Sequence, residues 1–271
     1  HYARGAPSDE KFEGPAARRQ AKLRDAMDAF NRHVAADDRM QQLLLPFRDG
    51  LAIAQPSSPD DAAALLDFAA GAKADSTAAP EMRYLAEVGT PETALFARLR
   101  AEASVSSGHL VGAQLGRLLY MLVRLSKALP SCNVLEVGSA PVPYLSAWLA
   151  AAVPETGEVL ALHADDASAA RASQLLEPTG LASRLRCVVA QEYLEELARL
   201  QSSFELIVLR DSELTRAIAV HAARLLSPSG CLAILMPAGV DHHSRLERVY
   251  RDVSAASLTA AVVPSPDGDG W

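Results

Sequence analysis

Cysteine is scarce in this sequence, and its few copies exclude the sites that depend on it. The three cysteines, Cys132, Cys187 and Cys231, are scattered, and no two of them form a CxxC pair. This spacing offers neither a zinc site nor a redox dithiol, and the odd number argues against a disulfide framework. We expect each thiol to act as a small apolar side chain in or near a strand, which fits a reducing compartment.

Long apolar runs and long runs of one charge are also missing. No segment approaches the ~20 apolar residues of a membrane-spanning helix. The formal net charge of the 271 residues is -7, with both signs interspersed, so no basic surface for nucleic acid is predicted. The chain begins HYARGAPSDE, without Met or an apolar leader. We expect a soluble intracellular protein, with import into a chloroplast or mitochondrion as an alternative.

Residues 1–80 are predicted to form a polar, mainly helical extension with a linker. Apolar side chains recur there at helical spacing, at Leu23, Met27, Phe30 and Val34. A second helix is predicted from Ser58-Pro59-Asp60 to Gly71, because Pro suits a helix start and Gly a helix end. Two roles remain open for this extension, which either binds a partner or packs against the rest of the chain.

Residues 81–271 alternate short apolar strands with helical segments. The predicted strands, in chain order, read NVLEVG, EVLALHA, LRCVVA, FELIVLR and CLAILMP. Continuous apolar runs are expected where helices cover both faces of a parallel sheet. Gly180 and Gly230 are predicted to end two of the helices. The pattern predicts an α/β fold with a doubly wound sheet, in which ligands bind at the carboxyl ends of the strands.

The strand ends carry a resemblance to a known family. They read LEVGS, LALHADD, VVAQEYL, LIVLRDSE and ILMPAG, with QLGRLLYMLVRL before the sheet and PSPDG near the end of the chain. In order and spacing, this series resembles the S-adenosylmethionine-dependent O-methyltransferases of the caffeoyl-CoA and catechol type. The resemblance implies a class I methyltransferase (Rossmann-like) fold for residues 81–271, after a helical extension over residues 1–80.

The first strand-end loop keeps half of the family's cofactor motif. Glu136 and Gly138 match the acid and the glycine that the family places beside the methionine end of S-adenosylmethionine, and Ser139 matches a small hydroxyl residue. Pro141 and Pro143 stand where the family has a second glycine. Because proline has no N–H, two potential donors to the cofactor are lost.

Two more cofactor positions follow from the resemblance. His163 stands where the family has an acid that binds the ribose hydroxyls, and Asp165 is two residues further on. Asp165 either takes over that role or supplies a negative charge to the start of the next helix. Gln191 stands where the family's acid meets the adenine amine, and it either accepts from that amine or simply begins a helix.

The family's metal positions carry unsuitable side chains. Arg210 replaces the metal-binding aspartate, Glu213 replaces a lysine, and Met236-Pro237 replaces an Asp-Asn pair. Magnesium takes oxygen ligands, and a guanidinium about 4 Å from a dication costs several kcal/mol even at an effective dielectric of about 20. We therefore expect no catalytic metal. No catalytic residue is assigned, although His109 is a candidate base without an identified partner.

Three functions stay open at this point. The leading hypothesis is a degenerate O-methyltransferase homologue, a pseudoenzyme that serves as a structural or assembly subunit of a larger complex or homo-oligomer. The alternative is an active, metal-independent methyltransferase that uses S-adenosylmethionine. A third hypothesis is a regulatory domain that binds a small anion through Arg210.

Overall fold

The computed structural model describes residues 15–37, 39–45, 51–56, 92–107, 113–125, 132–190, 203–210 and 225–235. The chain divides into two compact units. One comprises residues 1–97 with 266–268, and the other comprises residues 98–265 with 269–271. The predicted boundary between residues 80 and 81 lies outside the described residues and stays a prediction.

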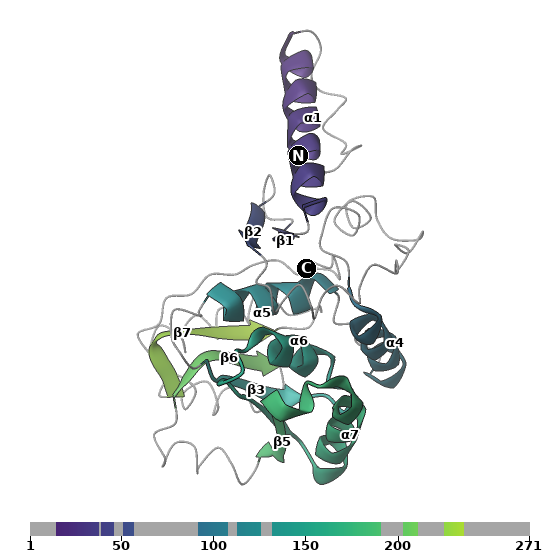
Figure 1. Cartoon of the computed structure of the whole chain (residues 1–271), viewed down its shortest axis with the longest axis vertical. Helices are drawn as coiled ribbons and strands as arrows, with labels where there is room; N and C mark the ends of the chain where they lie inside the picture. Colours follow the sequence, from purple (N-terminus) through teal and green to yellow (C-terminus); the bar gives the residue numbers. More distant parts are fainter. Residues whose placement is uncertain are drawn as a thin grey trace, which may run out of the picture. The chain divides into compact units, whose positions relative to one another are not determined.

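The first unit contains a helix and a hairpin. Helix α1 spans Pro15–Ala35, and strands β1 (Met40–Leu45) and β2 (Leu51–Pro56) pair antiparallel (Figure 1). Helix α1 confirms the first predicted helix, and the hairpin is an added element that the prediction of a mainly helical extension did not include. The reason lies in PFRDG between the two apolar runs, since Pro and Asp-Gly favour a hairpin connection. The predicted helix up to Gly71 lies outside the described residues.

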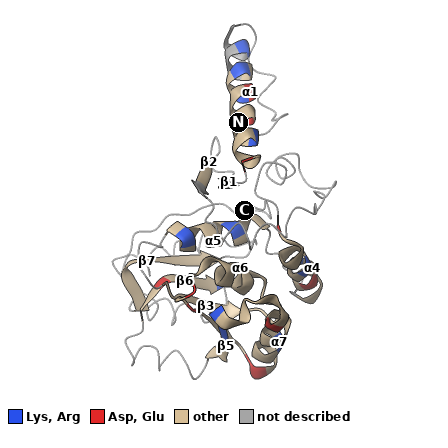
Figure 2. Ribbon diagram, viewed as in Figure 1, with Lys and Arg blue, Asp and Glu red and all other residues tan. Residues whose placement is uncertain are grey.

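Charges of both signs lie along α1 and just after it (Figure 2). The Arg32 Nε lies 3.1 Å from an Asp28 carboxylate oxygen, one helical turn away. After the helix, Asp37 accepts hydrogen bonds from the Arg39 guanidinium and backbone N–H, which lower the pKa of Asp37 to about 2. The hydrogen bonds between Asp37 and Arg39 lie in the turn between α1 and β1.

The second unit is built on a parallel sheet of five strands (Figure 1). The strands are β3 (Val134–Ser139), β4 (Val159–His163), β5 (Leu185–Val189), β6 (Phe204–Arg210) and β7 (Leu226–Leu235). Their order is β5-β4-β3-β6-β7, so the chain runs outward from β3 in one direction and then from β6 in the other. The switch point therefore lies between β3 and β6, where folds of this kind bind ligands.

Strand β7 begins earlier than the sequence predicts. Gly230 was expected to end a helix, yet it lies inside β7. The pairing of β6 with β7 shifts from Phe204↔Leu226 to Leu206↔Cys231, so β7 contains a bulge at this point. A Cβ on Gly230 would lie 2.9 Å from the Phe204 carbonyl oxygen, so glycine is needed for close approach of the two strands.

Helices precede β3 and connect β3 to β4 and β4 to β5, in keeping with the predicted alternation of strands and helical segments. They are α4 (Ala94–Ser107), α5 (Ala113–Leu125), α6 (Tyr144–Ala152) and α7 (Asp166–Leu176). A 3-10 turn, η2 (Glu177–Thr179), follows α7 and ends at Gly180, whose φ is +73° as the predicted stop requires. Helix α6 packs against β3 and β4, and α7 packs against β4 and β5. No helix within the described residues is long and apolar enough to cross a membrane.

Helix α6 is held against α5 by one indole ring. A Cβ on Gly116 of α5 would overlap the ring of Trp148 on α6, so only glycine leaves room for this ring. Tyr120 and Tyr144 meet the same ring edge-on, with centroids 6.1 Å and 6.5 Å away. Such edge-to-face contacts stabilise aromatic clusters beyond the area that they bury.

Successive strand residues face opposite sides of the sheet. One side forms an apolar cluster that includes Leu135, Val137, Leu160, Leu162, Ile207 and Leu209. On the other side, Glu136 of β3 is hydrogen-bonded to Ser146 of α6. The face that α6 covers therefore carries the polar residues of the site.

The cysteines lie as predicted, in or beside strands and without disulfide bonds. Cys132 is buried just before β3, while Cys187 lies in β5 and Cys231 in β7. Burial raises the pKa of the Cys132 thiol to about 11. This thiol is therefore protonated at neutral pH and packs as a small apolar group.

Candidate functional site

Glu136, near the carboxyl end of β3, is completely buried at 0 % exposure. Its Oε2 accepts a hydrogen bond of 2.5 Å from the Ser146 hydroxyl on α6. Its Oε1 has no hydrogen-bond partner among the described residues. Buried polar atoms are nearly always hydrogen-bonded in folded proteins, to protein, water or ligand. Glu136 thus presents one buried acceptor at the strand end.

Ser139 and His163 add further buried polar atoms beside it. They are partners in the register of β3 and β4, after an irregularity between Val137 and Ser139. Within the described part of the chain, the Ser139 Oγ and both ring nitrogens of His163 lack partners at full hydrogen-bond geometry, although the Ser139 backbone lies close enough to act on the imidazole. An unsatisfied buried donor or acceptor costs about 1–3 kcal/mol, so a polar ligand or water is expected here.

Burial is the main influence on the His163 imidazole. It lowers the pKa of His163, whereas the negative charges of Glu136 and Asp165 and the backbone of Ser139 oppose the shift. The ring is therefore neutral at neutral pH, with one nitrogen that donates and one that accepts. A neutral imidazole offers a ligand a donor that the family's carboxylate does not have.

Gly138 brings the ends of β3 and β6 together. Its φ is +82°, a conformation that glycine adopts without steric cost. A Cβ at this position would lie 3.5 Å from both the Cβ and the carbonyl oxygen of Arg210. The missing side chain therefore leaves space directly beside Arg210.

Arg210 is the last residue of β6 and is partly buried. The register pairs Glu136 with Val208, so alternation places Arg210 on the same face of the sheet as Glu136. No ion pair or hydrogen bond of the guanidinium is found within the described residues. Arg210 supplies no oxygen to a metal ion, and Glu213 and Met236-Pro237 lie outside the described residues. Arg210 therefore does not suit the ligand position that the resemblance assigns to it, and the absence of a catalytic metal stays a prediction.

The proline-containing loop offers few backbone donors. Pro141 and Pro143 have no N–H, and the Tyr144 N–H already donates to the Val142 carbonyl oxygen at 2.9 Å. Pro143 occupies the N-cap of α6 without a side-chain cap. The loop therefore lacks at least three of the backbone donors that a glycine-rich cradle would offer to a ligand.

Asp165 caps α7. Its Oδ1 accepts a hydrogen bond of 2.7 Å from the Ser168 N–H, and this bond is the main cause of the lowered pKa of Asp165. The structure thus shows the helix-start role, one of the two that the sequence left open. The ribose-binding role of Asp165 stays a prediction, while Gln191 and His109 lie outside the described residues.

Two substitutions separate the two roles of Asp165. Asn is as good an N-cap as Asp, whereas Ala is not. We expect Asp165→Ala to lower the thermal unfolding midpoint by about 2–4 °C and Asp165→Asn to leave it nearly unchanged. Thermal unfolding followed by circular dichroism measures this. Equal midpoints for the two variants would contradict a capping role.

Comparison with known proteins identifies the fold in which these residues lie. No family model matches the sequence, and no curated protein matches it significantly. A protein from Klebsiella pneumoniae, described by inference as an O-methyltransferase, aligns at 25% identity over 64% of this chain and 81% of its own, with a TM-score of 0.51. A protein from Corynebacterium glutamicum aligns at 19% identity over 63% of this chain and 84% of its own, with a TM-score of 0.52. The fold is that of an O-methyltransferase.

The O-methyltransferase fold confirms the resemblance drawn from the strand ends, and with it the predicted Rossmann-like parallel sheet. An O-methyltransferase from Bacillus cereus in complex with SAH aligns at 24% identity, over 54% of this chain and 67% of its own, with a TM-score of 0.48. Glu136, Gly138 and Ser139 lie at the end of β3 in this fold, and their role in cofactor binding stays a prediction. His163, which the sequence marked only as a lost acid, is a further candidate beside them.

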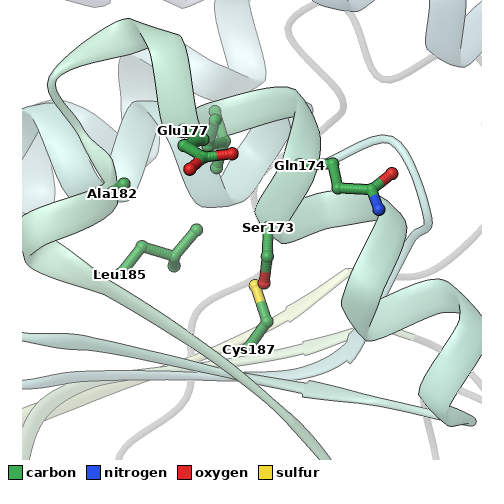
Figure 3. Close-up of a pocket in the computed structure, with 7 residues that line it drawn as sticks. Ser173, Gln174, Glu177, Ala182, Leu185 and Cys187 are labelled. Carbon is green, nitrogen blue, oxygen red and sulfur yellow. The ribbon is translucent and has the colours of Figure 1, made fainter.

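A separate hollow of about 360 Å³ lies between α7 and β5 (Figure 3). Its lining includes Ser173, Glu177, Leu185 and Cys187, and the Ser173 hydroxyl and the Cys187 sulfur point toward each other. The Ser173 hydroxyl already donates to the Ala169 carbonyl oxygen at 3.0 Å. This hollow lies toward the amino end of β5, away from the strand ends that carry the site.

Proposed function

We propose that the chain binds S-adenosylmethionine at the carboxyl ends of β3, β4 and β6 and acts as a metal-independent methyltransferase. The observation that supports this most strongly is the group of buried, unpartnered polar atoms on Glu136, Ser139 and His163. They lie on adjacent strands next to the switch point, where an open α/β sheet binds its ligand. A retained shape without a ligand would give no reason to keep them.

In this proposal, different residues contact different parts of S-adenosylmethionine. The space over Gly138 admits the ligand, while Glu136 and Ser139 offer polar contacts near its amino-acid end. His163 offers a donor and an acceptor to the ribose hydroxyls, in place of the family's acid. The cofactor supplies an electrophilic methyl group on a sulfonium. The chain then contributes by orienting the acceptor and excluding water, since proximity alone accounts for a large part of such rate enhancements.

A non-catalytic structural or assembly subunit is the second candidate. Arg210 at the former metal position and the two prolines in the cofactor loop support this candidate. Isothermal titration calorimetry with S-adenosylmethionine distinguishes the two. A micromolar dissociation constant supports the methyltransferase, whereas absence of binding at millimolar ligand eliminates it and leaves the subunit role.

Gly138 and Gly180 provide a matched pair of variants. Both have positive φ, but an added Cβ meets nothing within 4 Å at Gly180, whereas at Gly138 it lies beside Arg210 in the site. Alanine at either position is expected to cost about 1 kcal/mol of folding free energy, because the backbone is strained. Only Gly138→Ala should weaken cofactor binding, by about tenfold or more, in the same calorimetric titration. Equal affinities of the two variants would place the ligand elsewhere.

A further inference from the structure

The Arg210 guanidinium is a partly buried cation for which the described residues supply no anionic partner. Arg210 ends β6, its Cβ and carbonyl oxygen lie beside the space that Gly138 leaves open, and strand alternation directs its side chain to the face of Glu136. A cation in such a position attracts an anion more strongly than a fully exposed one, because less water screens it. We infer that the methyl acceptor carries a carboxylate group and that Arg210 binds this carboxylate. This inference rests on the proposed function.

The chemistry of the side chain selects a carboxylate. A guanidinium is planar, always charged and presents its N–H groups as a fork that matches two carboxylate oxygens. No ion pair joins Glu136 to Arg210 among the described residues, and the Glu136 Oε2 accepts from the Ser146 hydroxyl on α6 instead. Negative charge on β3 and positive charge on β6 thus suit a cationic cofactor next to an anionic acceptor.

Arg210 is then a substrate-binding residue and not a replacement for the metal. A metal ion would bind the oxygen that attacks the methyl group. If the Arg210 guanidinium binds a carboxylate elsewhere in the acceptor, it does not bind the attacking hydroxyl. It only orients that hydroxyl toward the methyl group. Arg210 therefore determines which acceptors bind, and its loss should act on acceptor affinity without an equal loss of cofactor affinity.

Two probes that differ only in charge test the inference. The carboxylate probe is 3,4-dihydroxybenzoate, and the neutral probe is 3,4-dihydroxybenzamide, with the same ring and hydroxyls. Calorimetric titration of the full chain, with and without S-adenosylmethionine, gives both affinities. We expect the wild type to prefer the benzoate by about tenfold or more, since a charge-assisted pair is stronger than a neutral one. Arg210→Gln should abolish the preference, and Arg210→Lys should keep part of it.

The matched control is Arg186→Gln on the outer strand β5, where Arg186 lies 3.1 Å from Glu158 at the surface. It should leave the preference unchanged, and circular dichroism verifies that both variants are folded. Equal binding of the two probes, or no binding of either at millimolar concentration, overturns the inference. If the cofactor still binds in that case, the proposed function stands. If the benzoate preference depends on Arg210 but no cofactor binds, the proposed function fails and the carboxylate site remains.

Discussion

Replacement of Gly157 by alanine is expected to lower the free energy of unfolding by about 3 kcal/mol. Gly157 is buried just before β4, and its N–H donates to the Pro154 carbonyl oxygen at 2.9 Å. An added Cβ would overlap the carbonyl oxygen of Cys132 and lie 3.1 Å from the Pro154 ring and 3.2 Å from the Val153 Cβ. The closest of these atoms belongs to the backbone and cannot turn aside as a flexible side chain does.

The overlap falls between the segments that lead into β3 and β4. Chemical denaturation followed by circular dichroism gives the free energy of unfolding for the wild type and Gly157→Ala. The control is Gly180→Ala, which has no atoms within 4 Å of the added Cβ. It should lose only about 1 kcal/mol, from backbone strain alone. If Gly157→Ala were no less stable than this control, the described approach of the two strands would be incorrect.

Stability of the wild type is expected to fall between pH 7 and pH 5 through the buried His163. Burial lowers the pKa of His163 in the folded state, against about 6.5 in the unfolded chain. Below pH 6.5 the unfolded chain therefore takes up a proton that the folded chain resists, and unfolding becomes easier as the pH falls. Above pH 6.5 this contribution vanishes. The slope for one group is at most about 1.4 kcal/mol per pH unit.

His163→Asn isolates this contribution, because asparagine does not titrate in this range. Denaturation of both chains at pH 5, 6, 7 and 8 gives two stability profiles, and other titrating groups affect both alike. The profiles should run parallel above pH 7 and separate below it, with the wild type falling faster. Parallel profiles throughout would show that His163 charges as readily in the folded chain as in the unfolded one.

The central strands β3, β4 and β6 were predictable because they are buried on both faces. NVLEVG and FELIVLR contain β3 and β6 almost residue for residue, since a continuous apolar run between breakers has few other solutions. The start of β7 was not predictable in this way. Gly230 serves equally well as a helix end and as a bulge glycine, and only its approach to the Phe204 carbonyl oxygen distinguishes the two.

The candidate site was predictable where the residue type itself carries the information. Glu136 and Gly138 follow from a strand that ends in an acid and a glycine. The cap formed by Asp165 is local and was one of the two roles that the sequence left open, whereas the burial of His163 depends on how other elements cover β4, which a single sequence does not encode locally. The roles of Asp165 and Gln191 in cofactor binding, like the partners and the compartment, stay predictions.

The site depends on Gly116 of α5, although Gly116 is not one of the residues of the site. Trp148 fits only because Gly116 has no side chain, and the helix that carries Trp148 also carries Ser146, the partner of Glu136. A single substitution at Gly116 could therefore displace α6 and break the contact between Ser146 and Glu136, even where every residue of the site is unchanged. For homologues of this chain, inheritance of the site is to be judged at Gly116 as well as at the strand ends.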